Sequence, residues 1–142
     1  MKIIRISVDN EISTYDFPEG SYSQQNQALR KLIGPRCELY EHVMPNRLYT
    51  KLGASNKVSR KKGACVSMLM DEEALYHDLK ENLVGSYLYE TDRHGWAIAG
   101  NILLVGETLG GEGIDFCGIA EDQFTMLLPK LTELAEKARN HR

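Results

Sequence analysis

WAIAGNILLVGE, residues 96–107, is the stretch that decides the fold of this chain of 142 residues. At its centre lies the uninterrupted apolar run of residues 102–105, with Gly100 and Gly106 on either side. A short continuous apolar run between turn-forming residues is typical of a strand buried within a sheet. We therefore predict that residues 96–107 form the central strand, entered through a turn at residues 92–95.

The other strands are predicted from alternation and from turn signals. Residues 2–8 alternate apolar and polar side chains, Asp9-Asn10 favours a turn, and residues 11–17 alternate again, which predicts an opening β-hairpin. Further strands are predicted over residues 37–43, 64–70 and 114–119. Before the last of these, the glycine-rich residues 106–113 are predicted to be a flexible connection, because they lack the lysine and hydroxyl of a phosphate-binding loop.

Helices are predicted between these strands along the chain. A serine at position 21 or 23 can cap a helix that runs to Ile33, and Gly34-Pro35 ends it. Shorter helical segments are expected over residues 47–52 and 82–89. We interpret Gly100 and the asparagines at positions 82 and 101 as structural, since asparagine satisfies backbone groups at turns.

A longer helix is predicted from Glu121 to the C-terminus. Leucine and alanine recur there every three or four residues, and Lys137, Arg139 and Arg142 suit a helix end. Pro129 interrupts the pattern and predicts either a kink or two abutting helices. The leucine stripe is expected to face the core, and its alternative is a dimer seam.

Together these elements predict one α+β domain over residues 1–142. We expect a mostly antiparallel sheet of about five strands, flanked by the helix ending at Ile33 and by the C-terminal helix. The hydrophobic fraction of 42% and the charged fraction of 26% are ordinary for a globular protein.

Composition also narrows the cellular setting. The net charge of −3 gives no general attraction to DNA or to anionic membranes. The apolar run at the N-terminus is interrupted by Arg5 and Asp9, so we expect neither a signal peptide nor a membrane span. Three cysteines, an odd number spread along the chain, favour reduced thiols in a cytoplasm.

No catalytic or metal-binding pattern stands out. None of His42, His77, His94 and His141 is spaced from another histidine or a cysteine as in a local zinc site. A nucleophilic set of Cys117, His94 and Asp92 or Asp115 stays open in principle, but no family signature surrounds the cysteine. We therefore expect no cofactor, no metal and no enzymatic activity.

Charge is divided unevenly along the chain. Residues 47–62 carry six basic side chains and no acidic one, whereas residues 71–92 carry seven acidic side chains and only Lys80. The candidate binding residues in the basic segment are Arg47, Tyr49, Lys51, Lys57, Arg60, Lys61 and Lys62. The cations could bind the phosphates of a nucleotide or nucleic acid, and the tyrosine could stack on a base. The alternative is that the segment is a solvated loop without a ligand. The asymmetry also favours oriented docking to a macromolecule, or head-to-tail self-association into a homodimer.

Several segments resemble a family of small proteins from bacteriophages and mobile elements. The likeness lies in a helix ending in glycine (residues 29–34) and a following strand (38–41), an asparagine before a short helix (82–89), the strand IAGNILLVG (98–106), and Asp115-Phe116 with Gly118. The resemblance spans residues 1–135 but not the basic segment. It implies an accessory protein in the bacterial cytoplasm that inhibits or modulates a host protein, with anti-defence roles such as anti-CRISPR among its forms.

Overall fold

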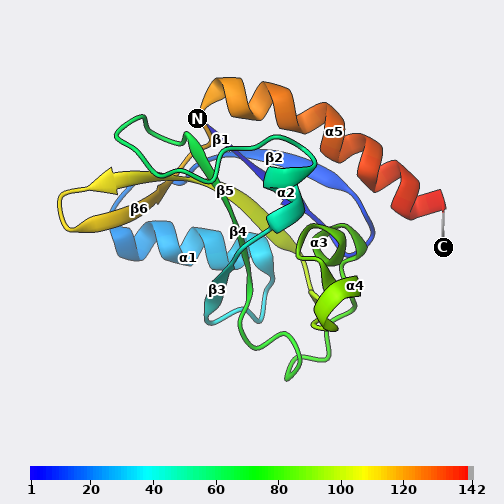
Figure 1. Ribbon diagram of the computed structural model, residues 1–142. Helices are drawn as coiled ribbons and strands as arrows, with labels where there is room; N and C mark the ends of the chain where they lie inside the picture. Colours follow the sequence, from blue (N-terminus) through cyan, green and yellow to red (C-terminus); the bar gives the residue numbers. More distant parts are fainter. Residues whose placement is uncertain (141–142) are drawn as a thin grey trace.

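A six-stranded antiparallel sheet lies at the centre of the computed structural model, which describes residues 1–140 (Figure 1). The strand order is β2-β1-β5-β4-β3, and β6 also pairs with β5. The strands are β1 (Lys2–Ile6), β2 (Ile12–Asp16), β3 (Tyr40–Val43), β4 (Cys65–Asp71), β5 (Ile102–Gly110) and β6 (Gly113–Cys117). The helices are α1 (Tyr22–Ile33), α2 (Asn46–Thr50), α3 (Leu83–Leu88), α4 (Thr91–His94) and α5 (Glu121–Asn140). The predicted α+β class is confirmed, with six strands where about five were expected.

Two helices cover the two faces of this sheet. α5 lies against one face and α1 against the other, as Figure 1 shows. Along β5, Ile102 and Leu104 contribute to the core on the α5 side, and Leu103 and Val105 contribute to the core on the α1 side. All four side chains are fully buried, which explains the uninterrupted apolar run and confirms its prediction as the central strand.

The predicted limits of the central strand were wrong at both ends. β5 begins at Ile102 rather than at residue 96, and it continues to Gly110 through part of the expected glycine-rich connection. Gly106 is inside the strand because another backbone passes close to it. A Cβ added there would lie 2.3 Å from the carbonyl oxygen of Gly118, so only glycine fits.

Residues 96–101 lie outside β5 and are held by an isolated bridge between Glu81 and Ala99 and by asparagine side chains. Asn82 is fully buried, donates to the carbonyls of Ile6 and Gly100 (3.0 Å each), and accepts from the amide of Gly85 (2.9 Å). The last of these bonds caps α3. Asn101 links α1 to the turn after β1 in the same way, by donating to Ile33 and accepting from Val8. Their predicted structural role is confirmed.

The C-terminal helix is a single element. α5 runs from Glu121 to Asn140 with Pro129 inside it, so the expected alternative of two abutting helices is wrong. Proline is tolerated because position 129 is exposed, while Leu127 and Leu131 on the opposite side stay fully buried. The leucine stripe therefore faces the core, and His141 and Arg142, both named in the sequence analysis, lie outside the described residues. No helix within residues 1–140 has the length and apolarity needed to cross a bilayer.

Candidate functional site

The predicted basic segment does not form one continuous surface. The hydroxyl of Tyr49 donates to the carbonyl of Val66 (2.6 Å), and its ring packs against the core. Burial raises the pKa of this phenol well above its ordinary value. Tyr49 is thus fixed by structural contacts, and it does not offer a free ring for stacking on a base.

The remaining cations of the segment stay at the surface. Their side chains follow α2 and the loop to β4, at Lys51, Lys57, Arg60, Lys61 and Lys62. Lys61 pairs with Asp122 at the start of α5 (3.1 Å), where both side chains are largely exposed. Lys62 borders a hollow of about 640 Å³ between the start of α1 and β6.

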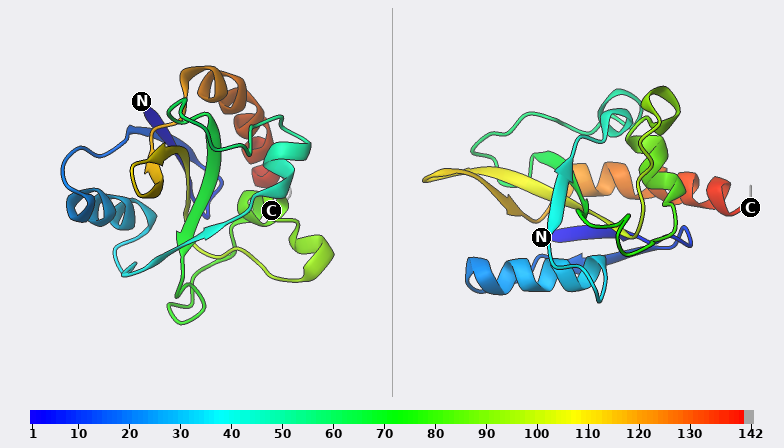
Figure 2. Two further views of the ribbon diagram at one scale, coloured as in Figure 1. Left: turned by 60° about the vertical axis from the view of Figure 1, so that its left-hand side comes forward. Right: turned by 90° about the horizontal axis from the view of Figure 1, so that it is seen from below.

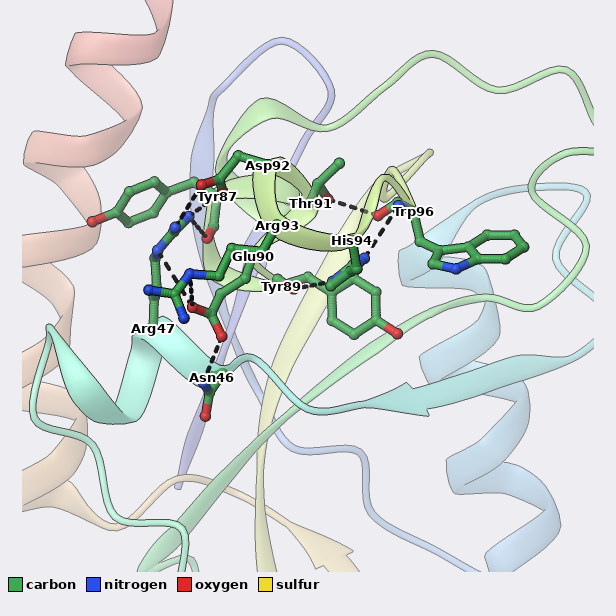
Figure 3. Close-up of polar contacts among 10 residues, drawn as sticks. All are labelled: Asn46, Arg47, Tyr87, Tyr89, Glu90, Thr91, Asp92, Arg93, His94 and Trp96. Atoms are coloured by element: carbon green, nitrogen blue, oxygen red, sulfur yellow. Dashed lines mark hydrogen bonds and ion pairs between the residues drawn. The ribbon is translucent and has the colours of Figure 1, made fainter.

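Arg47 instead forms the centre of a polar network on α2, α3 and α4 (Figure 3). Its guanidinium donates two hydrogen bonds to the carboxylate of Asp92 (2.6 and 2.8 Å) and one to the carbonyl of Tyr87 (2.9 Å). It also lies 4.8 Å from the centre of the Tyr87 ring. Arg47 therefore joins the basic and acidic segments, and these bonds hold the pKa of Asp92 at about 2, below its ordinary value.

The same network holds the backbone of Trp96. The hydroxyl of Thr91 donates to the Trp96 carbonyl (2.7 Å), and the Trp96 amide donates to Nδ1 of His94 (3.2 Å). The other ring nitrogen of His94 bonds the carbonyl of Tyr89 (2.7 Å). Figure 3 shows the indole pointing away from this network, and 70% of it is exposed. The fold thus fixes the backbone of a large aromatic side chain that it does not bury.

Beside the indole lies a hollow that we call the Trp96 groove. Its volume is about 320 Å³, and its lining residues come from β3, β4, the loop after β4 and the segment before β5. They are Glu41, Val43, Met70, Glu72, Ala74, Leu75, Tyr89, Trp96, Ala97, Ile98 and Ala99. The lining residues are spread between positions 41 and 99 of the chain, so this surface exists only in the folded protein.

Exposed apolar side chains lie in the segments that line this groove or flank them in the sequence. Leu75 (81% exposed) and Tyr76 (88%) lie on the loop between β4 and α3, which projects from the sheet in Figure 2. Leu39 and Met44, at the two ends of β3, are each about half exposed. Single exposed apolar residues are ordinary, but a cluster beside a hollow marks a surface for contact with another molecule.

The groove also has an acidic border. Glu41 and Glu72 line the groove, and Glu38 and Glu73 are close to them in the sequence. None of these four forms an ion pair with a lysine, arginine or histidine among residues 1–140. By contrast, Asp71 is buried and accepts from the ring of His77 (2.9 Å) and from the Glu73 amide. The unpaired carboxylates give this surface a negative potential that complements a basic ligand.

The structure does not assemble the nucleophilic set that the sequence left open. Both ring nitrogens of His94 form hydrogen bonds to the backbone of Tyr89 and Trp96. Cys117 is buried at the end of β6, which lies far from α4 in Figure 1. Burial raises the pKa of Cys117 and also raises the pKa of Cys37 and Cys65 to about 11. These thiols are protonated at neutral pH, which makes them poor nucleophiles.

A polar cluster on the α1 side of the sheet was not predicted. Glu107 is 4% exposed and lies 3.3 Å from Nε2 of His42, and the thiol of Cys65 donates to it at 3.6 Å. The ring of Phe116 packs edge-on against His42. Within the described residues, no group of three or more histidine, cysteine, aspartate or glutamate side chains is arranged to hold a metal ion.

Sequence reasoning missed the residues of the Trp96 groove. The available signal was the occurrence of Leu75 and Tyr76 within an otherwise polar stretch, where a large apolar side chain has no core to enter. Their neighbourhood with β3 depends on how the strands are ordered in the sheet, which adjacent residues do not reveal.

Comparison with protein-family models, curated proteins and solved structures found no match to this chain. The resemblance to small phage and mobile-element proteins stays a prediction that depends on the residues quoted for it.

Proposed function

We propose that this chain is a non-enzymatic binding protein that inhibits or modulates a host protein through the Trp96 groove. The phage or mobile-element setting, with its cytoplasmic location and anti-defence role, comes from the resemblance alone. The binding role has independent physical support.

One observation carries the proposal. Trp96 is 70% exposed, and a hydrogen-bonded network holds its backbone beside a hollow that Glu41 and Glu72 also line. Exposing tryptophan to water is unfavourable, and aromatic anchors contribute strongly to protein interfaces. Because the Trp96 backbone is already ordered, less conformational entropy is lost on binding.

The proposal is tested by capturing partners from a bacterial lysate with the immobilised chain. The comparison variant is Trp96→Ser with Leu75→Ser, two exposed positions whose replacement leaves the core intact. A stoichiometric partner that the wild type captures and this variant loses would support the proposal. If no stoichiometric partner is captured, or if both proteins capture it equally, this surface is not the binding site.

A second candidate is binding of an anionic ligand, such as a nucleotide or nucleic acid, by the exposed part of the basic segment. Lys62 beside the hollow of about 640 Å³ favours it, although Glu19 and Asp115 also line that hollow. Binding of labelled single-stranded DNA should then weaken with salt and disappear after charge reversal of Arg60, Lys61 and Lys62. Binding that is insensitive to salt, or absent, would exclude this function.

A further inference from the structure

We propose that the free edge of β3 accepts an extended, basic segment of a partner protein as an added strand, with one apolar side chain of that segment in the Trp96 groove. This inference rests on the proposed binding function, and it adds the backbone conformation and the charge of the partner. It begins from the direction of the backbone groups of β3.

β3 is the last strand on its side of the sheet. The amide of Glu72 donates to the carbonyl of Leu39 (3.0 Å), which makes these two residues a hydrogen-bonded pair in the extended β3–β4 ladder. Because such pairs alternate with non-bonded pairs, Glu41 and Val43 direct their backbone groups toward β4. Tyr40 and His42 therefore direct their amides and carbonyls outward, where no hydrogen bond to them forms within residues 1–140.

Two features limit pairing at the edge of β3, its short length and the charged Glu41, but other common protections are absent. Lysine, proline or a bulge commonly prevents another strand from pairing there, and the sequence of β3, YEHV, contains none of these. β3 is only four residues long, so its outward groups orient an added strand without supplying all of its affinity. The groove and the carboxylates are placed to supply the rest.

The side chains beside β3 indicate what the added strand contains. Glu41 and Val43 lie on the groove face, so a residue of the added strand beside them projects toward the hollow, where Met70 and Trp96 favour an apolar side chain. The unpaired carboxylates of Glu41 and Glu72 border that position. Lysine or arginine on the incoming segment would therefore be attracted to this edge.

Charge also decides between a basic partner and a second copy of this chain. Pairing β3 with β3 of another copy would place the same glutamates near one another, and like charges across neighbouring strands are destabilising. In the register that pairs residue 41 of one copy with residue 41 of the other, the two Glu41 carboxylates would lie side by side. The occupant is thus a basic segment of a different protein.

The test uses the full chain and a displayed library of ten-residue peptides. Each peptide carries lysine or arginine at several positions that vary from peptide to peptide, the other positions are random, and a matched library carries glutamate in place of the basic residues. We expect enrichment from the basic library only. Absence of enrichment, or equal enrichment from both libraries, would overturn the inference.

An enriched peptide is then titrated against two variants at one position. His42→Pro removes an outward amide without removing a bond to β4, and His42→Ala removes the same imidazole, with its contact to Glu107, but keeps the amide. The dissociation constant should be at least tenfold larger for His42→Pro than for His42→Ala. Equal constants for two folded variants would overturn strand addition.

Two measurements on the wild-type chain do not depend on the folding of these variants. Hydrogen exchange at the amides of Tyr40 and His42 should slow when the peptide binds. The alternate amides of the peptide form two sets, and N-methylation of the set that faces β3 should abolish binding, whereas N-methylation of the other set should not. Unchanged exchange would overturn the inference. If exchange is unchanged but binding of the peptide is lost in the Trp96→Ser variant, strand addition is wrong while the proposed binding function stands. If capture of a partner from lysate also fails, the proposed function itself is wrong.

Discussion

Replacing Asn82 with alanine should destabilise the protein more than the same replacement of Asn46 or Asn101. The side chain is fully buried and makes three hydrogen bonds, with the carbonyls of Ile6 and Gly100 and with the amide of Gly85. Alanine would leave all three backbone groups buried without these partners. The same residue joins α3 to the segment that lines the Trp96 groove, because its backbone amide donates to the carbonyl of Ile98 (2.7 Å).

The magnitude follows from the groups that lose their partners. A buried polar group without a partner costs about 1–3 kcal/mol, and losing a helix cap alone costs about 1 kcal/mol. Water entering the space left by the amide would recover part of this loss, so we expect about 3–5 kcal/mol for Asn82→Ala. That is a large part of the stability of an ordinary domain, about 5–15 kcal/mol.

Urea denaturation followed by far-ultraviolet circular dichroism measures this change. The matched control is Asn46→Ala, in which an exposed amide loses one hydrogen bond to Glu90 (2.5 Å). We expect a loss of about 0.5 kcal/mol or less for the control. If Asn82→Ala lies within about 1 kcal/mol of the control, the assigned hydrogen bonds do not stabilise the fold as argued.

Three further predictions concern the strand crossing, the Arg47 network and the thiols. Gly106→Ala should prevent stable folding, since its Cβ would lie 2.3 Å from the Gly118 carbonyl; a cooperative thermal transition near that of the wild type would contradict this close approach. Because Arg47 holds the pKa of Asp92 at about 2, below the ordinary value of an aspartate, the stability from this pair is complete above about pH 4 and is lost as the pH falls toward 2. Asp92→Asn should remove that part of the acid dependence. The measurement is the free energy of unfolding as a function of pH for the wild type and for the variant, and identical slopes for the two proteins would show that the pair is not formed. The three buried cysteines should react with a thiol reagent at pH 8 only after unfolding, and rapid labelling of the native chain would contradict their burial.

The parts of the fold that the sequence predicted correctly are those with a local cause. The apolar run of residues 102–105 requires burial on both faces, so its central position follows from composition alone. Ser21 caps α1 with Gln24 in a reciprocal capping box, and alternation sets the pairing of β1 with β2. Such signals act within a few residues and need no knowledge of the rest of the chain.

The candidate site had no comparable local signal. Arg47 and Tyr49 lie in a basic stretch, yet one binds Asp92 and the other binds the carbonyl of Val66, both through contacts between distant residues. The acidic segment from residue 71 was noticed for its charge, whereas its exposed Leu75 was not connected with Trp96. Charge is visible in a sequence, but whether a charge is paired depends on what the fold places beside it.

By itself, then, the sequence determined the α+β class, the central strand, the two covering helices and the structural role of Asn82, because each depends on a periodicity or on the chemistry of one side chain. Only the tertiary structure decided where β3 lies, which carboxylates stay unpaired, and how Trp96 comes to border a groove with Val43 and Met70. These features depend on the order of the strands in the sheet, which follows from the burial of the whole core rather than from any one segment.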